Sequence, residues 1–554
     1  PMKKAAALLA AVLGLAVLLA AGLVGVRLIR TYTPSNEPAD IDEILGSREG
    51  YVAIYLNNEL QEEQGIYYEG QTYVPVKWVN EKLNERFYWD SNENILVYTL
   101  PETIVYADEN TQGTSGAPLL VNREDGVYLA AGLVANYTNI RVEAFDEGEH
   151  KRIFVDSQWE PVEKAQLKRK GSVRVRGGIK SPVITRLDRG AGVILVEAMD
   201  TWVKVRTEDG YLGYVEKKRL GDIYEETPVS SFQEPVYTSV SMDEPVCMAW
   251  HQVTRPEAND NFESMVEDAN GLNVISPTWY ALTDNEGNFT SLADKEYVDK
   301  AHERGIQVWA LIDNFSDNVN TEILMAKTST RRKLIDSLMA EVEEYGLDGL
   351  NLDFEGIKEE AGVHYVQFIR ELSVACRNNG TVLSVDNYVP TEGTAFYNRK
   401  EQGIVADYVI IMGYDEHHGG GEAGSVASIG FVEDGIANTL KEVPKEKVIN
   451  AIPLYTRVWT EQEDGTTTSS ALGIARAQEW LDENQVSLRW DEDTGQYYGE
   501  LETDEGLKRI WMEESRSISL KMALIKKYDL AGVACWKLGF EPAQLWEDIR
   551  LDQE

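Results

Sequence analysis

The first distinct pattern along the chain is a long apolar segment close to its N-terminus. Two lysines precede a segment without charged residues that runs from Ala5 to Val26. The core of a signal peptide needs about 7–15 apolar residues, whereas about 20 are needed to span a bilayer. We therefore expect residues 1–30 to form a signal-anchor helix with its N-terminus inside the cell. A cleaved signal peptide is the alternative, and either one exports the rest of the chain.

Short strands dominate the next region, which follows a polar, proline-containing linker at residues 31–50. The stretches "YVPVKWVNEKLNERFYWDSNENILVYTL" and "YLAAGLVANYTNIRVEAFDEGEHKRIFVDS" share the order strand, helix, strand, turn, strand. Repeated units of this kind pair to share one core. We therefore expect a stalk-like α+β domain at residues 51–160.

Residues 168–224 show a second β pattern, with short alternating strands separated by glycine turns. The stretch "TWVKVRTEDGYLGYV" is typical of a two-stranded hairpin with Glu-Asp-Gly at its bend. The expected structure is a small β-barrel. It serves either as a spacer or as a wall-binding module, since a fold alone does not decide function.

From residue 242 to residue 554 the pattern changes to apolar strands that alternate with amphipathic helices. The strands include "QVWALIDN", "TVLSVDNY" and "YVIIMGYD", and one helix is expected to end at Gly346. Such alternation predicts a parallel sheet covered by helices, here a closed (β/α)8 TIM barrel. An open doubly wound sheet is the alternative. Residues 460–515 are too long for a simple loop and predict a small α+β insertion.

Charge and cysteine content narrow the possible functions. The 554 residues carry 53 basic and 93 acidic side chains, a net charge of -40, which argues against nucleic acid as a partner. Three cysteines give no disulfide framework, and no Cys or His spacing typical of a metal site occurs. We expect neither a metal nor a cofactor.

The stretch "YGLDGLNLDFEGI" places acidic residues where a buried strand normally has none. Asn351, Asp353 and Glu355 alternate with apolar residues, so they share one face of the strand about 6–7 Å apart. In a barrel this face is the interior, and the carboxyl end of a strand is where barrel enzymes have their sites. Two neighbouring carboxyls do not ionise independently, and the one that keeps its proton can act as a general acid.

The same stretch resembles the D-x-x-D-x-D-x-E strand of glycoside hydrolase family 18, the chitinase-like hydrolases. Asp348, Asp353 and Glu355 match this pattern, and Asn351 replaces the second aspartate. "YDEHH" and "IPLYTRVW" resemble a branch that includes spore cortex-lytic N-acetylglucosaminidases. Asn351 does not ionise, but it is able to hydrogen-bond Asp353. We therefore expect activity with an altered pH profile, which the Asn351→Asp variant should shift.

The two preceding regions resemble modules of exported proteins. Residues 168–224 are similar to bacterial SH3 domains, which are common on cell-wall enzymes. Residues 51–160 resemble stalk domains named after the N-terminal domain of copper amine oxidase. This second resemblance implies a spacer and no copper site.

The family resemblance implies a mechanism in which the substrate takes part. The 2-acetamido oxygen of the sugar attacks the anomeric carbon, so only one protein acid is essential. By resemblance, Glu355 protonates the leaving oxygen and then acts as base toward water, while Asp353 orients the acetamide N–H. Tyr414 would hydrogen-bond the acetamide beside Asp415, and Trp536 in "ACWKLG" would lie beneath the sugar ring.

Other residues at strand ends are candidate substrate contacts. Met412 belongs to the "MGYD" strand end that resembles the family pattern. Asn387 and Tyr388 follow the fifth strand, and Tyr455 follows the seventh. Trp279 is either a sugar platform or a packing residue, since aromatic side chains serve both roles.

Three functions are consistent with these features. The first is a wall-anchored hydrolase of β-1,4-linked N-acetylglucosamine glycans, with peptidoglycan as the favoured substrate, on the outer face of a Gram-positive plasma membrane. The second is a chitinase that acts on exogenous chitin. The third is a non-catalytic, lectin-like glycan-binding protein, a class that typically lacks the acid that is present here as Glu355.

Overall fold

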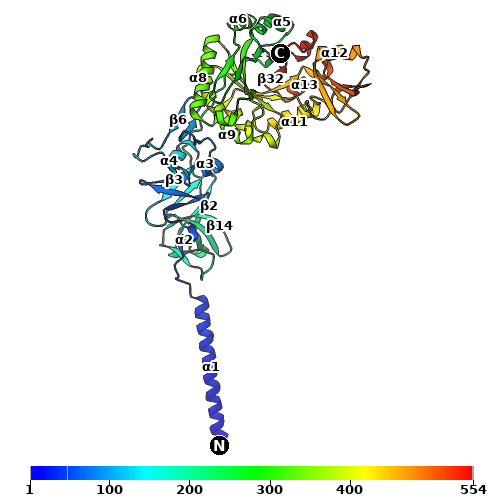
Figure 1. The fold of residues 1–554 in the computed structure, drawn as a ribbon. Helices are drawn as coiled ribbons and strands as arrows, with labels where there is room; N and C mark the ends of the chain where they lie inside the picture. Colours follow the sequence, from blue (N-terminus) through cyan, green and yellow to red (C-terminus); the bar gives the residue numbers. More distant parts are fainter. Residues whose placement is uncertain (1, 47, 552–554) are drawn as a thin grey trace. The chain divides into compact units, whose positions relative to one another are not determined.

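The computed structural model describes residues 2–46 and 48–551 (Figure 1). The chain forms two compact units, residues 1–87 with 107–234 and residues 88–106 with 235–554, which are described separately. The first unit begins with helix α1 (Met2–Tyr32). Its stretch Lys3–Tyr32 is long enough to cross a membrane, and an 18-residue window within it has a mean hydropathy of 2.7. A signal sequence has the same properties, so both expectations for this segment stay open.

The stalk-like region of the first unit contains a seven-stranded sheet and three short helices. The two sequence repeats begin alike, each with a strand followed by a seven-residue helix, α3 or α4. In sheet order the strands are β7 (Leu120–Arg123), β8 (Gly126–Ala130), β3 (Gln71–Pro75), β2 (Glu59–Tyr68), β1 (Tyr51–Leu56), β10 (Arg152–Asp156) and β9 (Arg141–Phe145), and the helices are α2 (Ile41–Leu45), α3 (Val76–Lys82) and α4 (Ala131–Tyr137).

The SH3-like region is a second seven-stranded antiparallel sheet around a small valine-rich core. The predicted hairpin is present, with Val203 paired to Val215 and Gly210 at the bend with φ of 73°. In sheet order its strands are β13 (Val183–Leu187), β12 (Gly171–Arg174), β16 (Leu212–Glu216), β15 (Trp202–Thr207), β14 (Gly192–Ala198), β11 (Val162–Leu167) and β17 (Leu220–Glu226).

Eight parallel strands of the second unit close into a barrel, which confirms the TIM-barrel prediction and excludes the open sheet. Closure occurs where β19 pairs with both β18 and β22. Helix α8 ends at Gly346 with φ of 70°, as expected. Around the barrel the strands are β18 (Val246–His251), β19 (Val274–Pro277), β22 (Gln307–Asp313), β23 (Gly349–Asp353), β24 (Val382–Tyr388), β25 (Tyr408–Met412), β26 (Val448–Pro453) and β32 (Gly532–Trp536).

Helices cover the outside of this barrel, and apolar side chains on alternate strand positions pack against them. Leu350, Leu352 and Phe354 of the acidic stretch belong to this outer core. The helices are α5 (Phe262–Val266), α6 (Lys295–Glu303), α7 (Thr321–Met325), α8 (Thr328–Tyr345), α9 (Glu359–Asn379), α10 (Arg399–Val405), α11 (Ile429–Thr439), α13 (Ser515–Lys527) and α14 (Trp546–Ile549).

Two β structures extend the barrel. A short hairpin adds to β22, and a five-stranded sheet with one helix is inserted between β26 and α13. The sheet begins at Tyr455, five residues before the start of the insertion expected from sequence. The elements are β20 (Tyr280–Leu282), β21 (Phe289–Ser291), β27 (Tyr455–Glu461), β28 (Thr467–Gly473), α12 (Ile474–Glu483), β29 (Leu488–Asp491), β30 (Gln496–Thr503) and β31 (Gly506–Met512).

A three-stranded sheet from the middle of the expected stalk region belongs, through residues 88–106, to the barrel unit. It contains β4 (Tyr88–Asp90), β5 (Ile95–Thr99) and β6 (Ile104–Ala107). The Asp90 carboxylate accepts hydrogen bonds from the Thr328 backbone N–H at 2.6 Å and from its hydroxyl at 2.7 Å. The Tyr88 ring lies under the guanidinium of Arg331. The last two strands of the first repeat therefore pack on barrel helices, whereas those of the second repeat complete the stalk sheet.

Candidate active site

Three aspartates face the barrel interior at the carboxyl ends of neighbouring strands. Asp313 on β22 is in register with Asp353 on β23. Leu352 is in register with Val385, so Asp353 and Asp386 are the next residues on β23 and β24 and lie side by side. The axes of adjacent strands are about 4.8 Å apart. Register, and not sequence proximity, therefore places three carboxyls in one layer.

Asn351 lies one layer below and uses all of its hydrogen-bonding groups. Its side-chain oxygen accepts from Trp250 Nε1 at 2.9 Å and from Ser276 Oγ at 3.3 Å. Its amide nitrogen donates to Ser384 Oγ at 3.0 Å and to Asp386 Oδ1 at 2.8 Å. The expected hydrogen bond to Asp353 is wrong, because the amide donates instead to Asp386, two positions beyond Ser384, the register partner of Asn351 on β24.

Glu355 follows β23 and is held by two neighbouring strand ends. Its backbone N–H donates to Asn314 Oδ1 at 2.9 Å, and its carbonyl accepts from Asn314 Nδ2 at 2.9 Å. The Tyr388 hydroxyl donates to Glu355 Oε2 at 2.9 Å and accepts from the Gly356 N–H at 3.0 Å. The carboxyl group is thus fixed at the top of the barrel.

Burial governs the protonation of these acids. It raises the pKa of Glu355, the hydrogen bond from Tyr388 opposes this, and the charges of Asp415 and Asp313 add to it. Burial also raises the pKa of Asp353 well above its usual value, with further increases from Asp386 and Glu355. Glu355 therefore keeps its proton at higher pH than a free glutamate, as a general acid requires.

Aromatic residues and one more acid complete the site on the other side of the barrel. Asp415, directly after Tyr414, has φ of 59° and accepts a hydrogen bond from the Tyr455 hydroxyl. The Tyr414 and Tyr455 rings meet edge to face with centroids 6.1 Å apart. The half-buried Trp536 lies at the end of β32, with its ring centroid 5.9 Å from that of Trp250. Backbone strain of the kind at Asp415 is concentrated at functional sites.

The remaining sequence candidates lie in different surroundings. Met412 ends β25 and is buried with 9% exposure. Trp279 is 1% exposed and donates from Nε1 to Asn259, in the core outside the barrel strands. Asn387 is 1% exposed and bonds Gln402 of α10 in both directions. The structure thus brings neither Trp279 nor Asn387 to the group around Glu355.

Asp313, Asn314 and Asp386 were not singled out by sequence analysis. Each is a polar residue at or just after the end of an apolar strand, in "QVWALIDN" or "TVLSVDNY". That position is a usable signal, because inward-facing acids at strand ends mark barrel sites. Among residues 2–46 and 48–551, no group of three or more His, Cys, Asp or Glu side chains has the geometry to hold a metal ion.

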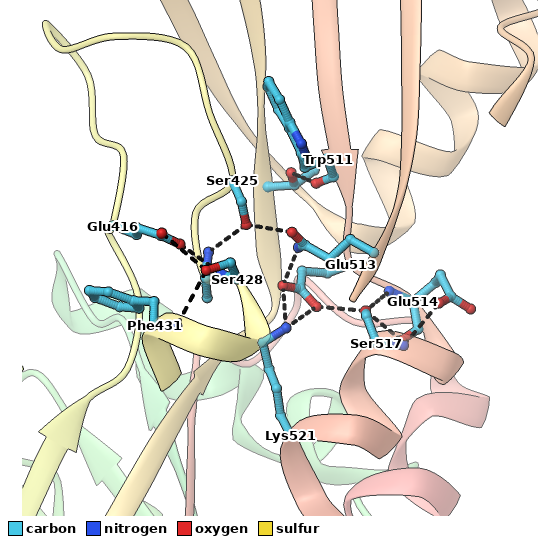
Figure 2. Close-up of polar contacts among 12 residues, drawn as sticks. Glu416, Ser425, Ser428, Phe431, Trp511, Glu513, Glu514, Ser517 and Lys521 are labelled. Atoms are coloured by element: carbon cyan, nitrogen blue, oxygen red, sulfur yellow. Dashed lines mark hydrogen bonds and ion pairs between the residues drawn. The ribbon is translucent and has the colours of Figure 1, made fainter. Parts of the chain in front are cut away.

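A buried ion pair fixes the loop that carries Tyr414 and Asp415 (Figure 2). Lys521 of α13 and Glu513, which follows β31, are both fully buried and 2.8 Å apart. Gln496 of β30 donates to Glu513 at 2.7 Å and accepts a hydrogen bond from Ser425 of the loop. The insertion and α13 therefore hold one end of this loop through a continuous polar network.

Replacing Lys521 with methionine is expected to destabilise the barrel by about 3–5 kcal/mol, because Glu513 would remain buried without its cation. Unfolding in denaturant, followed by tryptophan fluorescence, measures this loss. The double variant Lys521→Met/Glu513→Gln removes both charges and keeps an amide able to bond Gln496 and Ser517, so it should lose less stability. A double variant as unstable as the single one would contradict the role assigned to the pair.

Comparison with known proteins covers the barrel and the SH3-like region. A family model described as glycosyl hydrolases family 18 matches residues 211–541, and one described as bacterial SH3 domain matches residues 170–221. The crystal structure of the Bacillus cereus spore cortex-lytic enzyme SleL superposes with a TM-score of 0.51 at 20% identity, over 55% of this chain and 73% of that one. This likeness shows the fold.

Two similar proteins come from Bacillus subtilis. The uncharacterized glycosylase YvbX is 25% identical over 305 residues, which are 52% of this chain and 87% of YvbX. The cortical fragment-lytic enzyme is 29% identical over 241 residues, 42% of this chain. The match spans 56% of that enzyme's length.

Proposed function

The chain belongs to the glycosyl hydrolases of family 18 and is a glycosidase, and we propose that it cleaves β-1,4 bonds after N-acetylglucosamine in peptidoglycan. The observation that carries this proposal is the placement of Glu355. Its backbone and carboxyl are held at the end of β23, its pKa is raised, and Asp353 lies one inward position earlier on the same strand.

The proposed reaction uses one protein acid. Glu355 donates its proton to the glycosidic oxygen as the bond to the anomeric carbon breaks, and the substrate's acetamido oxygen bonds to that carbon. Asp353 accepts the acetamide N–H and faces the positive charge that develops on the ring formed. Glu355, now a carboxylate, takes a proton from the water that opens this ring, and the anomeric configuration is retained.

The opposite wall of the site is assigned to orienting the substrate. The proposal assigns Tyr414 to hydrogen-bond the acetamide, and Tyr455 holds the neighbouring Asp415. Trp536 offers a half-buried aromatic face at the end of β32 for stacking under the sugar. Met412 contributes apolar surface at the end of β25, and Asn351 contributes indirectly through Asp386.

Three features support peptidoglycan as the substrate and the outside of a Gram-positive cell as the location. The apolar N-terminal helix fits export by a signal-anchor or a signal peptide. The chain carries a bacterial SH3 domain, and one relative is named a cortical fragment-lytic enzyme. A chitinase activity is the second candidate, favoured by a relative named a probable endochitinase in Caenorhabditis elegans.

Product analysis distinguishes these candidates. The full chain in detergent, and its Glu355→Gln variant, are incubated with purified peptidoglycan and with chitin oligosaccharides, and the products are identified by mass spectrometry. We expect peptidoglycan fragments with N-acetylglucosamine at the reducing end from the native chain alone. Cleavage of chitin oligosaccharides only would favour the chitinase. Binding to glycan without cleavage would favour a lectin-like protein.

A further inference from the structure

Two carboxyl oxygens inside the barrel are buried and lack a hydrogen bond. They are Oδ1 of Asp353 and Oδ2 of Asp386. Within the described residues, 2–46 and 48–551, neither atom has a hydrogen-bond partner. The two residues lie side by side on β23 and β24. A buried carboxylate oxygen without a partner is costly, because desolvation is not offset.

A shared proton removes this cost. Two neighbouring carboxyl groups in a water-poor interior do not both ionise, so the pair holds one proton that bridges them. The neighbour below, Asn351, is unable to supply that proton: its amide is a fixed donor to Asp386 Oδ1, and its remaining groups are engaged by Trp250, Ser276 and Ser384.

We propose that Asp386 is the proton partner of Asp353 and thereby a positioning residue for the reaction. The inference rests on the proposed function. In the resting site the proton lies between Asp353 Oδ1 and Asp386 Oδ2. When the acetamide N–H of the substrate approaches, the proton stays on Asp386 and Asp353 becomes the charged acceptor. The pair contains one proton before and after, and no bond to the sugar is made by Asp386.

Asn351 and Asp386 differ from the family motif in a related way: an amide stands at position 351, and a carboxyl group stands on the neighbouring strand. The motif that this chain resembles has an aspartate at the position of Asn351. Here the carboxyl lies on β24 instead, and the amide of Asn351 is hydrogen-bonded to it. An amide is the suitable neighbour, because a second carboxyl at position 351 would place another negative charge next to Asp386.

Four other titratable side chains face the pair of Asp353 and Asp386. Asp313 and Glu355 face it from the same end of the barrel, and both carry carboxyls. Tyr365 of α9 and Tyr414 of the loop after β25 also lie within electrostatic range of Asp386. The pKa of Tyr365 is raised by burial and by these acids, so its phenol remains neutral across the working pH range.

Infrared spectroscopy of the full chain in detergent tests the shared proton without relying on activity. Buried acids that stay protonated near neutral pH give a carboxyl C=O band that ionised groups lack. We expect Asp386→Asn and Asp353→Asn each to remove the same band, or to shift its titration to lower pH. A band that survives in one variant and vanishes in the other would assign the proton to one residue and overturn the inference.

Kinetics test the positioning role on a glycan that the native chain is first shown to cleave. The Asp386→Asn variant should lose about 10²–10³ in kcat, the scale of one pre-organised stabilising group, with a smaller change in KM and a shifted pH profile. Adding Asn351→Asp should not restore the rate, because the side chain at position 351 contacts residue 386 and not Asp353.

The outcomes separate this inference from the proposed function. A native chain that cleaves no glycan would contradict the proposed function, while the infrared result would still decide the proton pair. Unchanged kcat and pH profile in Asp386→Asn would overturn the inference alone. So would a double variant Asp386→Asn/Asn351→Asp that recovers the native rate, because a carboxyl at position 351 would then replace Asp386.

Discussion

Replacing Glu355 with glutamine should reduce turnover by about 10²–10⁴, the contribution of a positioned general acid and base. Glutamine fits the same space and still accepts a hydrogen bond from Tyr388, but it has no proton to give to the leaving oxygen. Initial rates on N-acetylglucosamine oligosaccharides, measured as newly formed reducing ends, report the loss. An exposed glutamate nearby, Glu359 in the first turn of α9, provides a matched control: Glu359→Gln should keep native rates.

The pH profile adds a signature of the same group. The pKa of Glu355 is raised, so the acid form persists to higher pH than in a free glutamate, and the rate should fall as pH rises through that pKa. The residual rate of Glu355→Gln should lack this decline. An aryl leaving group departs without protonation. With such a substrate, the Glu355→Gln variant should regain much of the rate of bond cleavage. Equal losses with both leaving groups would contradict the role of Glu355 as acid.

Replacing Asp353 with asparagine should lower kcat by about 10²–10³, as expected for a charge aimed at the developing positive ring. Here the aryl leaving group should give no recovery, because the missing interaction is with the acetamide and not with the leaving oxygen. Rates on the two substrate types make this comparison. Asp336→Asn, at an exposed position of α8, is the matched control. Recovery of Asp353→Asn with the aryl substrate would show that Asp353 assists the leaving group instead.

The fold was largely predictable because its signals are local. Apolar strands alternate with helices throughout the barrel region, and Gly346 ends α8 as its position indicated. The packing of the three-stranded sheet at residues 88–106 was not predictable in this way. Its sequence repeats a unit of the stalk region, and the contacts that decide its packing, such as Asp90 with Thr328, join residues far apart in the chain.

The site was predictable where its residues share one strand, and less so where register across strands decides. Asn351, Asp353 and Glu355 follow from the alternation of β23 alone. The partner of Asn351 is Asp386 on β24, a contact that depends on strand pairing. Trp279 was a candidate from its position at a strand end, but it is not part of the site. A tryptophan at such a position packs equally well into the core, where Asn259 accepts its indole N–H.

The anomeric configuration of the first product tests the central claim most directly, because one protein acid and a substrate acetamide imply retention. Proton NMR during early hydrolysis of a soluble N-acetylglucosamine oligosaccharide by the native chain records which anomer appears before mutarotation. The account predicts the β-anomer first, and no product with the Glu355→Gln variant over the same interval. The α-anomer first would mean direct attack by water with a second protein base, and would contradict the mechanism proposed for this site.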